Sequence, residues 1–315
     1  MSHEVENMFY VNQTPWHGLG QRLIEVPTIQ EGIAAAGLDW TVSLKPLVTK
    51  ETGMDVPAMA TFRNDNEKVL GVVGPNYKPL QNIEAFNFFQ PVLEQGLATL
   101  ETAGSLRDGK RVWILAKLKG DPINIAKGDD ILKYALLSNS HDGTMAVRVG
   151  FTPIRVVCAN TLSMSHNNAQ SQLIRVRHSG NVVENLELIR ETMDMANAKF
   201  EAQAEQYRFL ASRQINKSDL KKYIEVVFGM APETERKRSS AVMENVLQMF
   251  DKGRGNDIDS IKGTYWAAYN AAIEYMQYES GKDRDARLDK NWFGQNVSKN
   301  NLALQTAITM ATLAA

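Results

Sequence analysis

Apolar and polar residues alternate with a period of two along much of the first half of the chain, which is typical of half-buried β-strands. The alternation is clearest over residues 111–119, where Val112, Ile114 and Ala116 share one side. Asp108-Gly109, just before this segment, predicts a hairpin turn back to residues 97–103. Further strands are predicted at residues 40–45, 57–62, 69–73, 131–139, 145–151, 154–158 and 173–178. The pattern predicts an antiparallel sheet that continues to about residue 180.

Two short helices interrupt these strands. Thr28 and Glu31 have the spacing of a capping box, which predicts a helix through Ala36 that Gly37 ends in the left-handed conformation. A second helix is predicted from Asn82 to about residue 95.

The second half of the chain changes to the three-four spacing of amphipathic helices. Apolar residues from Leu186 to Leu210 predict one long helix with a heptad-like seam, which packs on the sheet or on another subunit. Later helices are predicted to begin near Ser218, Thr234, Ser260 and Ser298. The predicted fold is therefore α+β: an antiparallel, β-rich domain over residues 1–180, then a long amphipathic helix and an α-helical domain over residues 181–315.

Composition narrows the class of protein. The 35 basic and 36 acidic residues give a net charge of -1, so binding to nucleic acid would need a local basic patch. Cys158 is the one cysteine, which excludes an intrachain disulfide. Neither the N-terminus nor the apolar stretch 302–315 resembles a signal peptide or a membrane span. We expect a cytoplasmic protein that contacts no membrane and needs no cofactor.

Five segments together resemble one protein family. They are 15–20 (PWHGLG), 70–82 (LGVVGPNYKPLQN), 103–113 (AGSLRDGKRVW), 155–162 (RVVCANTL) and 263–275 (GTYWAAYNAAIEY). The chain is similar to the phage/plasmid-like proteins known as domain of unknown function 932. This resemblance implies carriage by phages and plasmids, whose genes often serve replication, recombination or defence against restriction. It transfers no catalytic residue to this chain.

Three catalytic or ligand-binding arrangements are weak in this sequence. Residues 104–110 have the glycine spacing of a phosphate loop, but Arg111 stands where a hydroxyl should hold Mg²⁺, so a hairpin turn explains them better. One region holds several thiol, imidazole and carboxyl groups, at Cys158, His141, Asp142, His166 and His178, but without close metal-ligand spacing. Glu101, Asp108 and Asp142 would have to converge to form a metal-dependent nuclease site.

The strongest signal is a run without any Asp or Glu from Gly143 through Val183. This run contains four arginines and a loop of amide side chains, which suit the phosphates and sugars of a nucleic acid. The predicted nucleic-acid-binding residues, with two basic neighbours on the adjacent strand, are Arg148, Arg155, Arg175, Arg177, Lys110, Arg111, Asn160, Asn167, Asn168 and Gln172.

Other interpretations of the same residues stay open. The arginines could instead pair with Glu184, Glu187 and Glu191 of the predicted long helix. Trp113, Phe151 and Tyr134 could stack on bases, but core positions suit them better. A second basic cluster at Arg236-Lys237-Arg238 is best explained as a solvated helix face.

The order of elements resembles that of Rad52-like single-strand annealing proteins, which is an analogy at the level of fold. We therefore expect a non-enzymatic homo-oligomer that binds single-stranded DNA and promotes annealing in recombination or replication. One alternative is an interaction protein of a mobile element that acts against restriction or another host defence. A further alternative is a metal-dependent nuclease.

Overall fold

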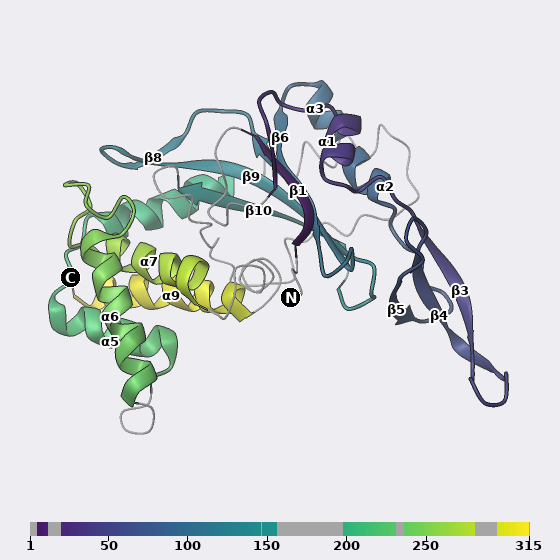
Figure 1. Cartoon of the computed structure of the whole chain (residues 1–315). Coiled ribbons are helices and arrows are strands. Elements are labelled where there is room, and N and C mark those ends of the chain that lie inside the picture. The colour runs from purple at the N-terminus through teal and green to yellow at the C-terminus, as the bar shows by residue number, and fades with distance from the viewer. Residues whose placement is uncertain are drawn as a thin grey trace. The chain divides into compact units, whose positions relative to one another are not determined.

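The computed structural model describes residues 5–11, 20–145, 147–155, 198–230, 236–280 and 295–314. It confirms the α+β class, with antiparallel sheets in the first half and helices mainly in the second (Figure 1). Contacts divide the described chain into two compact units. The first contains residues 5–119 and 134–150, and the second contains residues 120–133, 151–155 and those from 198 onward. The predicted boundary near residue 180 falls outside the described residues.

The larger sheet contains seven strands among the residues that the structure describes. Its order is β10 (Arg148–Arg155), β9 (Asp129–Ser140), β7 (Arg111–Leu118), β6 (Ala98–Leu106), β1 (Val5–Val11) and β2 (Gln21–Leu23), while β8 (Ile123–Ala126) also pairs with β9. The pairs β1–β6, β6–β7, β7–β9 and β8–β9 are antiparallel, and β2 is parallel to β1. The described part of the acid-free segment thus contributes β10, which is an edge strand among those that the structure describes. The sequence pattern did not indicate β1, β2 or β8.

Three short helices belong to the first unit: α1 (Ile29–Ala35), α2 (Asn82–Asn87) and α3 (Gln90–Glu94). Thr28 and Glu31 form the predicted capping box of α1, and Gly37 has the predicted positive φ of 59°. Leu100 on β6, Phe9 on β1 and Phe86 on α2 are fully buried and meet around Gly32 of α1. The three helices therefore cover one face of the larger sheet (Figure 1).

A three-stranded antiparallel sheet completes this unit. It consists of β3 (Val42–Val48), β4 (Asp55–Arg63) and β5 (Val69–Val73), which confirms the predicted strand pair around residues 64–67. The neighbouring turn at residues 142–143 packs closely on β5, because a Cβ on Gly71 would lie 2.6 Å from Asp142.

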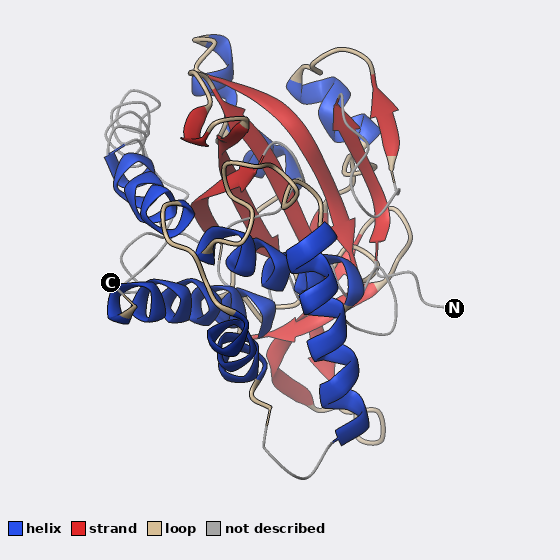
Figure 2. Ribbon diagram, turned by 90° about the vertical axis from the view of Figure 1, so that its left-hand side faces the viewer, coloured by secondary structure: helices blue, strands red, loops and turns tan. Residues whose placement is uncertain are grey.

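Besides the strand residues within 120–133 and 151–155, the second unit is a group of packed helices. Figure 2 draws all helices in blue. Residues 198–211 are helical and are followed by α5 (Lys217–Phe228), α6 (Arg236–Lys252), α7 (Tyr265–Glu274), the π-helix η1 (Tyr275–Glu279) and α9 (Gln295–Leu313). Trp266 and Tyr269 on α7 are fully buried and pack on Tyr207, with ring centroids 4.7 Å and 6.2 Å away. The described part of the predicted heptad-like seam, which includes Tyr207 and Leu210, is therefore buried within the chain.

Four details of the predicted elements were wrong. The helix predicted from Asn82 to about residue 95 is two helices, because Pro91 lies in the first turn of α3 and lacks a backbone N–H. The strands predicted at 145–151 and 154–158 are replaced by the single strand β10 over the described residues. The helix predicted from Ser260 begins at Tyr265, where Thr264 caps it. Finally, β7 is buried on both faces rather than half-buried, since Trp113 is 3% and Val112 0% exposed.

Candidate nucleic-acid interface

The predicted basic surface is only partly within the described residues. Arg148 and Arg155 are the first and last residues of the edge strand β10. The other predicted contacts on the acid-free run lie outside the described residues, and these are Arg175, Arg177, Asn160, Asn167, Asn168 and Gln172. Two further groups also lie outside the described residues. They are the predicted acidic partners, Glu184, Glu187 and Glu191, and the possible ligands Cys158, His166 and His178. Among the strands that the structure describes, β10 stands at one edge of the larger sheet and pairs with β9.

Lys110 and Arg111 come from the hairpin between β6 and β7, as predicted from Asp108-Gly109. The Lys110 carbonyl accepts a hydrogen bond of 2.8 Å from the His141 backbone N–H, and Arg111 pairs with Ser140 across β7 and β9. Both basic residues are therefore held beside the connection that leads from β9 into β10. The hairpin also confirms that residues 104–110 form a turn between strands and not a phosphate loop.

One carboxylate lies within this basic neighbourhood. Asp142 accepts hydrogen bonds from the backbone N–H and the hydroxyl of Thr144, at 2.9 Å and 2.6 Å. Burial alone would raise the pKa of Asp142, but these hydrogen bonds, a further one from Ser140 and the charge of Arg111 outweigh it and lower the pKa. Asp142 therefore stays ionised and reduces the positive potential around Arg111.

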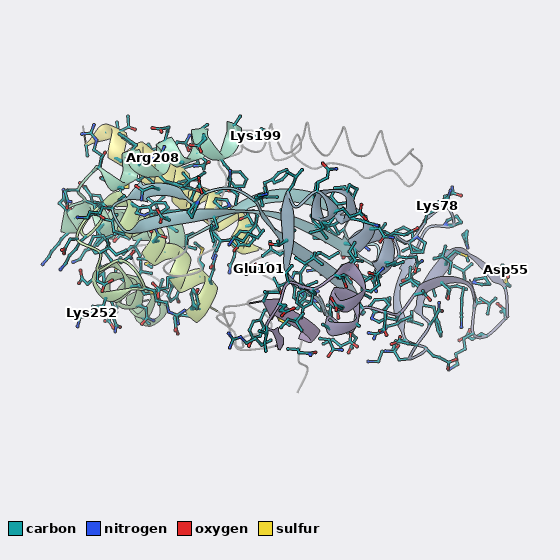
Figure 3. The ribbon with its side chains drawn as sticks, turned by 90° about the horizontal axis from the view of Figure 1, so that it is seen from above. Asp55, Lys78, Glu101, Lys199, Arg208 and Lys252 are labelled. Carbon is teal, nitrogen blue, oxygen red and sulfur yellow. The ribbon has the colours of Figure 1, made fainter. Side chains whose placement is uncertain are left out.

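Glu101, Lys117 and Tyr134 form a row of ionisable groups across three adjacent strands. Lys117 and Tyr134 are directly paired on β7 and β9, and Glu101 occupies a β-bulge on β6, where the register shifts between Leu100 and Thr102. Burial raises the pKa of Glu101, and the nearby Lys117 partly offsets this. Figure 3 labels Glu101 beside the strands of the larger sheet. Lys117 therefore shares its surroundings with an acid and adds little net charge to the predicted surface.

A buried cluster of aromatic and charged side chains holds the β6–β7 hairpin in place. Arg63 at the end of β4 is 4% exposed and lies over the ring of Trp40 at 4.2 Å. Its Nη1 donates to both carboxylate oxygens of Glu6 at 2.6 Å, while Nε and Nη2 donate to Asp65 at 2.7 Å and 2.9 Å. Gly109 has a φ of 90° and packs so closely that a Cβ would lie 2.8 Å from Trp40. The hairpin that carries Lys110 is thus fixed by buried contacts.

His141 is the second ionisable group of this cluster. It is fully buried and packs edge-on against Trp40, with ring centroids 5.3 Å apart. The Asn82 amide nitrogen donates to the carbonyls of Leu38 and Trp40, so its Oδ1, 3.0 Å away, accepts from Nε2 of His141. Nδ1 of His141 has no hydrogen-bond partner among the described residues. Burial lowers the pKa of His141 to about 4, with Arg63 adding to this effect and Asp142 opposing it.

The residues proposed for a metal site do not converge where they are described. Glu101 lies at the bulge of β6, whereas Asp108 lies in the hairpin turn at the other end of the strand and pairs with Lys68 at 3.1 Å. The strand from Glu101 to Leu106 alone spans about 17 Å. Within the ranges that the structure describes, no three His, Cys, Asp or Glu side chains gather as metal ligands.

The structure also gives the positions of the three aromatic residues that could stack on bases. Trp113 and Tyr134 are buried, which supports core roles, and Phe151 is half-buried against Phe200 with ring centroids 6.3 Å apart. The cluster at Arg236-Lys237-Arg238 opens α6, but the surroundings of these side chains are not described.

Comparison with known proteins decides the family. The model of the domain of unknown function DUF932 matches residues 69–304. The chain belongs to this family. The match begins at β5 and ends within α9, so it includes the hairpin of Lys110 and the whole of β10. No curated protein and no solved structure matches the chain. No helix in the described ranges has the length and apolar character needed to cross a membrane.

Proposed function

We propose that this protein binds single-stranded DNA along a basic surface that starts at β10 and includes the β6–β7 hairpin. The observation that carries the proposal is the placement of the acid-free run. In its described part this run forms β10, which begins at Arg148, ends at Arg155 and is an edge strand among those described, and Lys110 and Arg111 are held beside the connection into it. Phosphate binding needs such a local excess of positive charge in a chain whose net charge is -1.

Binding of single-stranded DNA suits this surface better than sequence-specific binding of double-stranded DNA. Across the described part of the basic surface, no helix is presented that could enter a major groove, and the basic residues come from strands and a turn. Contacts of Arg and Lys to phosphates, with amide side chains on sugars and bases, would give binding with little sequence preference. We further propose that a homo-oligomer uses this surface to promote annealing, in the context of phage or plasmid recombination or replication.

The test is fluorescence anisotropy with labelled single- and double-stranded oligonucleotides over a series of salt concentrations. Each phosphate contacted on a single strand contributes about -0.7 to the slope of log K against log salt. The variant Arg148→Ala/Arg155→Ala should therefore make the slope shallower by about 1.4 and weaken binding. Arg22→Ala/Arg213→Ala is the matched control, because it removes the same charge from exposed positions outside the run.

A second candidate function has one observation in its favour. Val69 and Val72 on β5 are 55% and 60% exposed, and Val48 and Met54 on the β3–β4 hairpin are 57% and 65% exposed. Exposed aliphatic groups of this kind are common at contacts with other proteins. An interaction protein of a mobile element would form a complex with a host protein that survives nuclease treatment. It would bind neither oligonucleotide at low salt.

A further inference from the structure

The loop between β5 and α2 is held firmly against the end of β9. The hydroxyl of Tyr77 donates a hydrogen bond of 3.1 Å to the Ser140 carbonyl. Asn82, at the start of α2, is hydrogen-bonded at 3.0 Å to His141, the residue that follows Ser140. The loop therefore has a fixed position beside the connection that leads from β9 into β10. It belongs to the segment 70–82 that resembles the family, and the proposed function gives it no role.

Tyr77 lies close to the basic residues of the β6–β7 hairpin. Ser140, which holds its hydroxyl, is directly opposite Arg111 in the ladder of β7 and β9. The His141 N–H bonds to the Lys110 carbonyl. Arg111 and Ser140 are therefore a non-hydrogen-bonded pair, with Cα atoms about 4.5 Å apart. In such a pair the Ser140 carbonyl points away from β7, to the side of β9 where β10 pairs. The Tyr77 hydroxyl thus lies on the β10 side of β9, one strand from Arg111.

The loop offers an aromatic ring and a cation at this position. Lys78 is exposed, and Tyr77 is half-buried, with its hydroxyl bonded and part of its surface accessible (Figure 3 labels Lys78). The Tyr77 backbone N–H donates to the Gly74 carbonyl at 3.1 Å, and Pro75 and Pro79 restrict the backbone on both sides. The ring is therefore held in one orientation, which reduces the entropy that is lost when a flat group stacks on it.

Charge favours a neutral group over a phosphate at Tyr77. Asp142 is ionised and lies near Tyr77, since burial and the charge of Asp142 both raise the pKa of the tyrosine. A phosphate beside this carboxylate would be repelled, whereas the face of an uncharged base would not. Phosphates of the same strand can bind the neighbouring cations Lys78 and Lys110.

A basic surface alone does not distinguish single strands from a duplex, because both carry phosphates. The preference for single strands needs a group that contacts unpaired bases, and aromatic rings serve this purpose in proteins that bind single strands. Trp113 and Tyr134 are 3% and 6% exposed, and Phe151 packs on Phe200. Tyr77 is better placed for this contact, because it is more accessible than the two buried rings and adjoins the basic residues.

We propose that Tyr77 stacks on an unpaired base of the bound strand and that Lys78 contacts a phosphate next to that base. This role rests on the proposed function and adds to it the group that selects single strands. The bases of a duplex are stacked on each other, so a duplex reaches Lys78 but not the ring of Tyr77. Every base has a flat face, so the contact distinguishes unpaired from paired bases and not one sequence from another.

The test compares two labelled oligonucleotides by fluorescence anisotropy: a single strand of thymines, and a single strand of the same length that consists of abasic sites. Both carry the same phosphates, but the second offers no base to stack on. The wild type should bind the thymine strand about tenfold more tightly. Tyr77→Leu should lose most of this preference and keep the salt slope, whereas Tyr77→Phe, which keeps the ring, should retain the preference. Lys78→Ala should weaken the binding of both strands and make the slope shallower by about 0.7.

The matched control is Tyr10→Leu, which makes the same change at a half-buried tyrosine of β1, three strands from β9. It should bind both strands like the wild type. Equal weakening of both strands by Tyr77→Leu would indicate a structural role and overturn the inference. A wild type without the preference overturns it too, as does a preference that Tyr77→Leu keeps or that Tyr77→Phe loses. In these cases the wild type still binds single strands, so the proposed function stands. Absence of binding by the wild type at low salt overturns both.

Discussion

Replacement of Arg63 by methionine tests whether the buried charged cluster fixes the hairpin that carries Lys110. Methionine keeps much of the volume of the side chain but removes its charge. Arg63 is 4% exposed, and its guanidinium donates to Glu6 and Asp65 while it covers Trp40 at 4.2 Å. The substitution therefore leaves two carboxylates without this donor and removes the cation–π contact.

The expected loss in the free energy of unfolding follows from the burial of Arg63 and its partners. Removal of one partner from a fully buried ion pair costs about 3–5 kcal/mol. The side chains of Glu6 and Asp65 are 23% and 43% exposed, so water replaces part of the lost interaction, and loss of the ion pairs costs about 2 kcal/mol, below that range. The cation–π contact adds about 1 kcal/mol. We expect Arg63→Met to lower the free energy of unfolding of the first unit by about 3 kcal/mol.

Urea denaturation followed by tryptophan fluorescence measures this change. A slope of about 1–3 kcal/mol/M converts 3 kcal/mol into a midpoint lowered by roughly 1–3 M. Lys68→Met is the matched control, because the Lys68–Asp108 pair of 3.1 Å lies on the same hairpin but is about half exposed on both sides. A surface pair of this kind contributes less than about 1 kcal/mol. If Arg63→Met costs no more than Lys68→Met, the role given to the cluster is wrong.

Two further predictions concern other buried groups. The pKa of His141 is lowered to about 4 in the fold, below its usual 6.5, so its contribution to stability is complete above pH 6.5 and is lost as the pH falls toward 4. His141→Gln should flatten the dependence of the urea midpoint on pH in that interval, and an unchanged dependence would disprove this origin. Trp266→Phe removes the 2.6 Å hydrogen bond from the indole N–H to the buried Asp129 carboxylate. It should destabilise the second unit by about 2–3 kcal/mol, and thermal unfolding that matches the wild type would refute this.

The local signals of the sequence predicted much of the fold correctly. The capping box of Thr28 and Glu31 and the turn at Asp108-Gly109 depend on neighbouring residues alone, so each was visible in the pattern. The strand β2 was not visible in the pattern, because it is defined by its pairing with the separate segment β1. The burial of β7 on both faces was missed because Trp113 and Leu115 share their face of the strand with the basic residues Arg111 and Lys117.

The candidate interface was predictable in its charge but not in its surroundings. The acid-free run and the arginines at both ends of β10 can be seen in the sequence. The acidic neighbours of the basic residues cannot be seen in the sequence. Glu101 lies near Lys117 because of a β-bulge, and Asp142, which follows β9, lies near Arg111 at the start of the adjacent strand β7. His141 was grouped with possible metal ligands, whereas the fold buries it against Trp40 and Asn82.

The central claim is that the basic surface around β10 binds single-stranded DNA. It is tested most directly by the anisotropy of labelled oligonucleotides with the wild type, Arg148→Ala/Arg155→Ala and the control Arg22→Ala/Arg213→Ala. The account predicts that the wild type and the control prefer single strands with the same salt dependence, and that the test variant binds more weakly with a shallower slope. Absence of binding at low salt, or equal binding by the two double variants, would contradict it.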